Sequence, residues 1–368
     1  MSTNNGTSRR QLLIQAGKSA VAASLANLAG CFPKTGGEWP LEPDAGSNSD
    51  VIEPSCSTEP ANSTIDTPSM VADVFREDSV LLKTNSEGIS ILEPQGEVVQ
   101  QMLDQALSSL AGGAENPWPV LLPTYTDGMR VGLKVNCLNV RLPTSPALVR
   151  ALIASLLKNL SIAPSNIIVW DRRLDELINT GKYTAEDLQG AQLMGTVKDT
   201  SSTAGPGYSS TFCGTIEGST PRLSRILTHL TDITINCPVL KTHAVSGVTA
   251  GLKNIYGIID NPGSYHDNLV TALPALYQLP PIKNHIKLTI VDALRAVTLG
   301  GTDSAPDTTP KHIFVGTDPL ATDQYALDLV NQLRATRNKG GVDGAVLGWI
   351  DNAHKLGLGS KTYALAKL

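Results

Sequence analysis

The 368-residue sequence predicts an α/β domain with a mostly parallel sheet flanked by helices. From residue 71 onward, short runs rich in β-branched residues alternate with amphipathic segments, which is the pattern of this fold class. One β-α-β unit can be followed residue by residue. In addition, polar side chains recur where the expected strands end, and this observation predicts where a site lies in the fold.

The clearest β-α-β unit begins with an expected strand at Met129–Val135. Ser145 and Pro146 then have the residue types of a helix N-cap and a first helical position. Leucines repeat every fourth residue over Leu148–Leu160, so they share one face of the expected helix. The next strand is expected at Ile167–Trp170, parallel to the first.

The remaining elements follow from the same signals. Further strands are expected at Asp232–Asn236, Ile286–Val291 and His312–Val315. A helix over residues 97–111 ends at a glycine pair, and another begins at Asp318-Pro319 and runs to about Arg334. Residues 181–228 are dominated by Gly, Ser, Thr and Pro, and are expected to form an insertion.

Residues 1–31 resemble a twin-arginine lipoprotein signal. Arg9-Arg10 precede a weakly apolar run that a lysine interrupts, so the run is a poor membrane span. It ends in Leu-Ala-Gly-Cys, which resembles a lipobox with Cys31 as the lipidated residue. We therefore expect an exported protein that is anchored, through this lipid alone, at the periplasmic face of the bacterial cell envelope. An amphipathic N-terminal helix is the alternative.

The composition of residues 32–70 indicates how the chain is divided into a linker and a domain. The composition of the whole chain limits the class of partner. The stretch 32–70 is expected to be a disordered linker, which leaves 71–368 as a single α/β domain. Charged residues make up 17% of the chain against a usual figure of about 25%, and no Lys/Arg block is present. The sequence thus argues against a nucleic-acid partner.

The cysteines indicate no metal cluster. No Cys-x-x-Cys spacing exists, so neither an iron–sulfur cluster nor a structural zinc site is indicated. Cys56, Cys137, Cys213 and Cys237 remain for disulfides or buried thiols, and the sequence leaves their pairing open.

Polar residues follow the ends of the expected strands. Lys134 and Asn136 end one strand, Asp171 follows the next, and Asp292 ends a later one. Ligands of open parallel sheets bind beyond the carboxyl ends of the strands. If these strands are parallel, their polar residues meet at one edge of the sheet, together with Lys241 beyond a further strand.

The run from Lys241 onward is unusual because it places charged and polar residues among small apolar ones. Lys241 and Lys253 could hold a small anion such as phosphate or carboxylate, and a buried lysine can also act as a base. Their alternative role is a structural ion pair with an aspartate. His243 could shuttle a proton or bind a metal, or it could be a hydrogen-bonded core histidine.

Two later residues are candidates for the same site. His266 lies in a turn-rich loop and is expected either to cap the site or to be exposed. Asp323 falls on the apolar stripe of its expected helix, beside Ala326 and Val330. A carboxylate there should be buried and paired with a cation, such as Lys253, or with a backbone donor.

These residues carry a family resemblance. Lys241-Thr242-His243 leading into Thr249-Ala-Gly-Leu-Lys253-Asn254-Ile-Tyr-Gly257 resembles the hallmark of the domain-of-unknown-function 362 family, in its exported branch. Its other blocks correspond to Lys134-Val-Asn136, Thr144-Ser145-Pro146, Tyr265-His266, Ile290-Val291-Asp292-Ala293 and Asp318-Pro319-Leu-Ala-Thr-Asp323. The resemblance spans roughly residues 75–335 and implies that Thr249 and Asn254 also bind the ligand. Many members append a cysteine-rich ferredoxin segment, which this sequence lacks.

The sequence predicts a lipid-anchored cell-envelope enzyme with a Lys/His/Asp site for a small anionic ligand or cofactor. Catalysis is assigned to His243, Lys253 and Asp292, with Asp292 or Asp171 setting the protonation of the histidine or binding a metal. The sequence leaves the metal and the cofactor open. The alternatives are a non-catalytic ligand- or metal-capture protein and a redox accessory protein.

Overall fold

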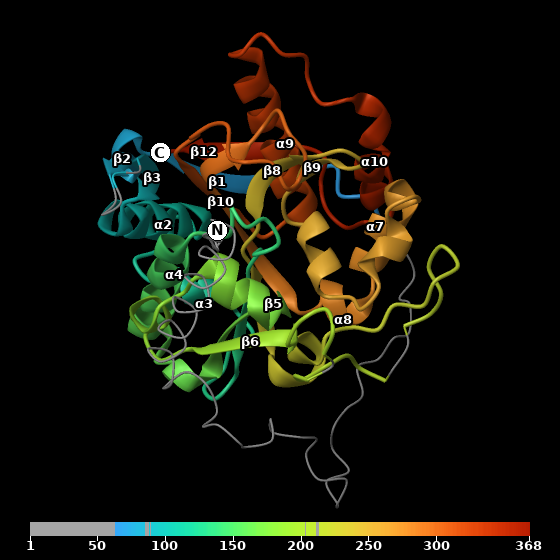
Figure 1. Cartoon of the computed structure of the whole chain (residues 1–368), viewed down its shortest axis with the longest axis horizontal. Helices are drawn as coiled ribbons and strands as arrows, with labels where there is room; N and C mark the ends of the chain where they lie inside the picture. The colour runs from blue at the N-terminus through green and yellow to red at the C-terminus, as the bar shows by residue number, and fades with distance from the viewer. Residues whose placement is uncertain (1–62, 85–87, 89, 203, 211–212) are drawn as a thin grey trace, which may run out of the picture.

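The computed structural model describes residues 63–84, 88, 90–202, 204–210 and 213–368 (Figure 1). A ten-stranded sheet runs through the molecule in the order β12-β1-β11-β10-β7-β4-β5-β6, with β8 attached to β10 and β9 to β8. The predicted fold class, α/β with a mostly parallel sheet flanked by helices, is confirmed.

The parallel part of the sheet contains four strands that the sequence predicted and a fifth, at residues 192–197, that it did not. It comprises β4 (Val131–Lys134), β5 (Ile167–Arg173), β6 (Gln192–Val197), β7 (Ile233–Asn236) and β10 (Ile286–Val297). Strands β4, β5 and β7 are in register, so Lys134 lies beside Trp170 on one neighbour and Asn236 on the other. Their carboxyl ends therefore share one edge of the sheet. Strand β10 continues six residues past its predicted end at Val291.

Alternating side chains of the sheet supply two separate cores. On one face, Val169 of β5 packs with α2 (Gly96–Leu110), α3 (Trp118–Leu121) and α4 (Pro146–Leu160). On the other face, Ile168 and Trp170 belong to the core of α7 (Leu269–Tyr277), α9 (Pro319–Ala335) and α10 (Gly348–Lys355). Figure 1 shows these two groups of helices on opposite sides of the sheet. Because both faces are covered, a ligand reaches the sheet at the ends of its strands.

Strand β11 (His312–Gly316) departs from the parallel order. It is antiparallel to both β10 and β1 (Ser69–Phe75). Asp318, which follows it, therefore lies at the opposite edge from the ends of β4 and β5, where it caps α9 by accepting hydrogen bonds from the backbone of Leu320 and Ala321 (both 2.9 Å). A strand's direction depends on its connection, which periodicity does not reveal.

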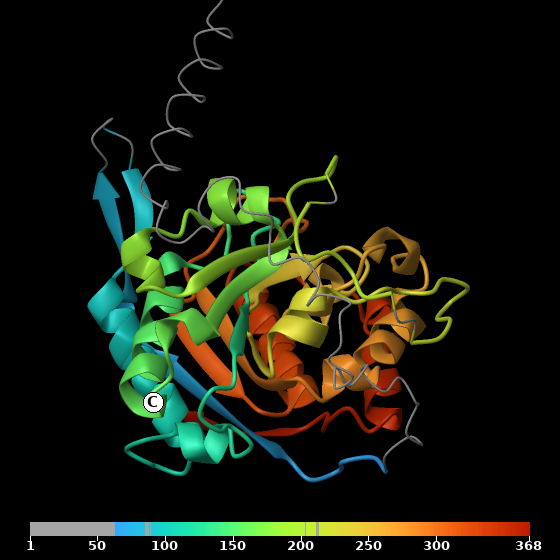
Figure 2. The ribbon, with the colours of Figure 1, turned by 90° about the horizontal axis from the view of Figure 1, so that it is seen from below.

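Several elements were not predicted. The Lys241 run begins with a hairpin of β8 (Val239–His243) and β9 (Gly247–Thr249), followed by the 3₁₀ helix η5 (Lys253–Gly257). Strand β12 (Tyr363–Lys367) pairs in parallel with β1, which begins within the last two residues of the predicted linker. A separate hairpin of β2 (Val80–Thr84) and β3 (Ser90–Pro94) projects from the body of the molecule (Figure 2).

The stretch 181–228, which was expected to form an insertion, includes regular secondary structure. It contains the short helix α6 (Ala185–Leu188) and the edge strand β6. The remaining short helical elements are η1 (Glu77–Ser79), η2 (Pro164–Asn166), α5 (Leu174–Glu176), η3 (Leu177–Gly181), α6 (Ala185–Leu188), η4 (Ile226–Leu230), η6 (Pro262–Tyr265), α8 (Pro280–Lys283) and η7 (Gly344–Val346).

The predicted signal, the predicted lipidation site Cys31, Cys56 and most of the predicted linker lie outside the described residues. Cys137 and Cys237 are free, buried thiols, whereas Cys213 is disulfide-bonded. Within the part of the chain that the structure describes, no helix is both long and apolar enough to cross a bilayer.

The cap of α4 provides a test of the local fold. The Ser145 hydroxyl accepts a hydrogen bond from the Leu148 N–H (3.2 Å), as the sequence predicted. We expect Ser145→Ala to lower the free energy of unfolding by about 1 kcal/mol, measured by urea denaturation. Ser145→Thr keeps the hydroxyl acceptor, so its free energy of unfolding should fall much less. Equal decreases in the two variants would contradict the capping role.

Candidate functional site

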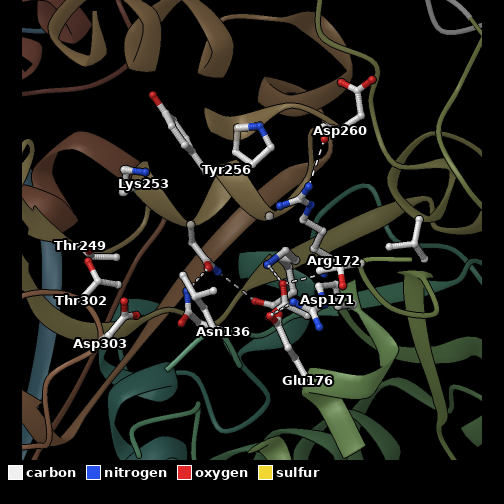
Figure 3. A pocket seen from close by; sticks show the side chains of 18 of the residues that line it. Asn136, Asp171, Arg172, Glu176, Thr249, Lys253, Tyr256, Asp260, Thr302 and Asp303 are labelled. Carbon is white, nitrogen blue, oxygen red and sulfur yellow. Dashed lines mark hydrogen bonds and ion pairs between the residues drawn. The ribbon is translucent and has the colours of Figure 1, made fainter. Parts of the chain in front are cut away.

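A cavity of about 680 Å³ opens at the carboxyl ends of β4 and β5, where the β8–β9 hairpin and η5 complete its wall (Figure 3). Nine of the eleven ligand-binding and catalytic residues predicted from the sequence line it. These are Lys134, Asn136, Asp171, Lys241, His243, Thr249, Lys253, Asn254 and His266. They come from four separate parts of the chain, and the parallel register of β4, β5 and β7 is what brings the first of them together.

The floor of the pocket is a buried ion pair. The Lys134 Nζ lies 2.7 Å from the Asp171 Oδ1, and the two side chains are 1% and 7% exposed. The other Asp171 oxygen accepts a hydrogen bond from the Cys137 backbone (2.7 Å), and Oδ1 also accepts one from the Arg172 backbone (2.7 Å). All described hydrogen bonds of Asp171 are thus to Lys134 and to two backbone N–H groups. The sequence had left a structural ion pair open for Lys241 and Lys253, whereas the structure forms it with Lys134.

Three asparagines connect the strand ends to Lys241. The Lys241 Nζ donates to the Asn136 Oδ1 (2.8 Å), and the Asn136 amide donates to the Asn254 Oδ1 (2.9 Å). Asn254 donates in turn to the Asn236 Oδ1, and Asn236 to the Gly251 carbonyl (both 2.8 Å). We call this chain of side chains the amide relay. It fixes both the position of each amide and the direction in which it points.

The hairpin presents three polar residues on one face. Lys241 and Thr249 are cross-strand partners, and His243 lies two residues beyond Lys241, so all three side chains point the same way. Lys241 is fully buried, and burial lowers its pKa to about 8. The buried Thr249 hydroxyl has no hydrogen-bond partner among the residues that the structure describes. A buried hydroxyl left unpaired is costly, so this atom marks a place where a ligand oxygen would be stabilised.

Lys253 is held by two rings. In a 3₁₀ helix, residues three apart are eclipsed, and the Lys253 Nζ accordingly lies 3.2 Å from the centroid of the Tyr256 ring. The same nitrogen lies 3.5 Å from the His266 Nε2. Burial, followed by the charge of Lys241, lowers the pKa of Lys253 to about 7. Among the described residues neither lysine forms an ion pair.

Both histidines of the pocket have assigned tautomers. The His243 Nδ1 accepts hydrogen bonds from the backbone of Val245 (3.1 Å) and Ser246 (3.2 Å), so the neutral ring carries its proton on Nε2. Burial and the nearby Lys253 lower the pKa of His243 to about 4. The His266 Nδ1 donates to the Pro262 carbonyl (3.0 Å), which leaves its Nε2 as an acceptor for Lys253. Burial also lowers the pKa of His266.

Two predicted site residues lie outside the pocket. Asp292 sits inside β10 rather than at its end, and its carboxylate accepts hydrogen bonds from the backbone of Ser145 (2.7 Å) and Leu294 (3.1 Å). Asp323 is buried, as predicted, but its partners are the backbone N–H groups of Gly251 (2.5 Å) and Leu252 (2.9 Å) rather than Lys253. Asp323 therefore positions the start of η5, and Asp292 positions the start of α4.

The sequence interpretation missed several polar residues that line the pocket. They are Arg172, Arg173, Glu176, Asp199, Tyr208, Tyr256, Asp260 and Asp303. Arg172 and Arg173 directly follow Asp171, so the strand-end argument could have included them. The others lie in connections whose course depends on tertiary structure. Burial, followed by the neighbouring charge of Asp171, raises the pKa of Glu176 to about 7.

The donor set of the pocket suits anions. Its cationic and N–H groups offer hydrogen bonds to phosphate or carboxylate, which would include the acidic groups of a cofactor. The described residues contain no group of three or more His, Cys, Asp or Glu side chains placed to hold a metal ion.

Comparison with known proteins identifies a family and two distant structures. The family model described as "Domain of unknown function (DUF362)" matches residues 131–328. A lactate racemase apoprotein from Thermoanaerobacterium thermosaccharolyticum aligns with 65% of this chain and 58% of its own, at 12% identity and a TM-score of 0.38. A protein from Thermotoga maritima aligns over 72% and 59%, at 12% identity and a TM-score of 0.35. This chain therefore covers under two thirds of either structure. No curated protein matches.

Gly257 packs against the ion pair and provides a test of the pocket floor. A Cβ at this position would lie 2.7 Å from the Lys134 Nζ and 2.9 Å from the Asp171 Oδ1. We expect Gly257→Ala to lower the free energy of unfolding by about 1–3 kcal/mol, because the buried pair must shift. Gly263→Ala is the matched control, since a Cβ there meets no atom within 4 Å. Equal urea midpoints for the two variants would show that the floor does not constrain Gly257.

Proposed function

Because the chain belongs to the DUF362 family, whose description names no activity, we propose its function from the pocket itself. We propose an enzyme that binds a small anionic organic molecule and transfers a proton to or from it. The observation that carries this proposal is the pair of buried lysines without a carboxylate partner, beside the unpaired hydroxyl of Thr249.

An anion would complete the pocket electrostatically. Two buried ammonium groups that form no ion pair within the described residues are destabilising, and their burial lowers the pKa values of Lys241 and Lys253. A carboxylate or phosphate oxygen between them would relieve the cost and would accept the hydrogen bond that Thr249 can donate. Lys134 would contribute little to binding this anion, because its charge is already neutralised by Asp171.

The two lysines are suited to different roles. Lys241, with the higher pKa of about 8, keeps its charge near neutral pH and would anchor the anion. Lys253, at about 7, is half neutral there and would accept or return a proton. His243 stays neutral at this pH and would offer its Nε2–H to a developing negative charge. Proton transfer, which the sequence assigned to His243, is therefore better suited to Lys253.

An ionisable group whose pKa lies near neutral pH distinguishes an enzyme site from a capture site. A capture site requires donors whose charge is permanent, whereas acid–base chemistry requires a group whose pKa lies near the working pH. Lys253 meets the second requirement, and this favours the enzyme over the ligand-capture alternative. No feature of the pocket favours a redox accessory role.

Anion binding and proton transfer, the two parts of the proposal, can both be tested by deuterium exchange without knowledge of the product. A panel of small carboxylic acids is incubated with the protein in D₂O, and incorporation beside the carboxylate is measured by mass spectrometry; binding is measured by thermal shift. Lys241→Met should abolish binding. Lys253→Met should retain binding but reduce exchange about 100-fold or more. Binding without exchange in the unaltered protein would favour capture, and no binding at all would refute the proposal.

The pH dependence of exchange follows from the two lysines. The rate should rise as the pH passes about 7, because neutral Lys253 accepts the proton. It should fall above about 8, because Lys241 loses the charge that holds the anion. We therefore expect a narrow, bell-shaped pH profile of the exchange rate when the acid is well below its saturating concentration. A rate that keeps rising to pH 10 would contradict the assignment of Lys241 as a charged anchor.

We also propose that the pocket works outside the cytoplasm, with the domain held at the membrane by a lipid on Cys31. The support is the pair Arg9-Arg10 together with the Leu-Ala-Gly-Cys segment. In a bacterial host, Cys31→Ser should move the protein from the membrane fraction to the soluble fraction and abolish labelling by a fatty-acid analogue. Arg9→Lys together with Arg10→Lys should block export. Unchanged fractionation of Cys31→Ser would refute the lipid anchor.

A further inference from the structure

We propose that the ligand carries two separate anionic groups, the first bound by Lys241 and the second by Arg172. This inference rests on the proposed function, because it extends the same pocket to a second anion subsite. It narrows the substrate from any small anion to an elongated dianion, either a dicarboxylic acid or a phosphorylated carboxylic acid.

The carboxylates beside Arg172 already have cationic partners. The pairs are Asp171 with Lys134 (2.7 Å), Glu176 with Arg173 (3.1 Å) and Asp260 with Arg222 (2.7 Å). Asp199, which also lines the pocket, accepts hydrogen bonds from Ser201. Within the described part of the chain, Arg172 forms no ion pair with a carboxylate, although it is the penultimate residue of β5 and lies among these acids.

The hydrogen bonds of Arg172 orient it without neutralising it. One Nη donates to the backbone carbonyl of Asp260 (3.1 Å), and Nε lies 3.4 Å from the Tyr208 hydroxyl. The second Nη makes no hydrogen bond within the described residues. A guanidinium that is held by neutral acceptors and has a free N–H edge can bind a carboxylate or phosphate in a fixed geometry. The Tyr208 hydroxyl accepts from Arg172, so its own proton remains available to the same anion.

The two cationic groups are separated within one cavity. Figure 3 shows Lys253 and Arg172 on different sides of the pocket, with Asn136 lower in the view. A cavity of about 680 Å³ is also far larger than one carboxylate or phosphate requires, and lies in the range of pockets that hold whole organic ligands. A ligand that fills this cavity and contacts both Lys241 and Arg172 would carry one anionic group for each of them.

The experiment measures affinity for unbranched α,ω-dicarboxylates of increasing length against monocarboxylates of the same length. Isothermal titration calorimetry is performed with the whole exported domain, and phosphonocarboxylates form a parallel series. We expect one length to bind at least about tenfold more tightly than its monocarboxylate. In Arg172→Gln this advantage should disappear while the monocarboxylate affinity is unchanged. A preference for the phosphonate series would support the same subsite with a phosphate as its group.

Controls separate this inference from the proposed function. Arg76→Gln removes the same charge from an exposed residue outside the pocket, and should keep the dicarboxylate advantage. Tyr208→Phe keeps the guanidinium and should reduce the advantage partially, which guards against a folding defect in Arg172→Gln. The second subsite is refuted if monocarboxylates bind through Lys241 but no dicarboxylate binds more tightly than its monocarboxylate. It is also refuted if Arg172→Gln weakens binding of monocarboxylates and dicarboxylates equally. In both cases the proposed function stands. If no acid binds, both fail.

Discussion

The buried ion pair between Lys134 and Asp171 is the interaction on which the rest of the pocket depends. It joins the ends of β4 and β5, and the second oxygen of Asp171 holds the backbone of the following loop at Cys137. Gly257 packs against it, so the pair also sets how closely η5 approaches the sheet. Removing one partner of such a pair leaves a buried charge and typically costs about 3–5 kcal/mol. The floor of the pocket is therefore rigid for electrostatic reasons as much as for packing.

Around this floor, the cations divide into two classes. Lys134 and Arg173 have carboxylate partners and contribute to the structure, whereas Lys241 and Lys253 are held by an amide and by aromatic rings. Neutral partners keep a cation in place without cancelling its charge. The buried charges destabilise the folded protein, and the proposed anion would relieve this cost, which is the exchange of stability for function often found at binding sites.

The sequence predicted the parallel core of the fold and most of the lining of the pocket, because both follow from local patterns. The cap at Ser145 and the leucine stripe after it are short-range signals, and Lys134 and Asp171 could be placed because parallel strands share an edge. Asp292 was misplaced because the end of β10 is set by its pairing with β8 and β11, which no local pattern records. The partner of Asp323 and the contributions of Tyr208 and Asp260 likewise depend on contacts between distant segments.

The amide relay has a consequence for what can occupy position 241. Its far end is the Gly251 carbonyl, which can only accept, so each asparagine must point its amide nitrogen toward Gly251 and its oxygen toward Lys241. None of the three amides can reverse alone without setting two oxygens or two N–H groups against each other. A backbone carbonyl on one loop thus dictates that the residue at 241 be a donor. An acidic side chain at position 241 would face the Asn136 oxygen, which cannot turn away. The relay therefore favours a hydrogen-bond donor such as lysine at this position.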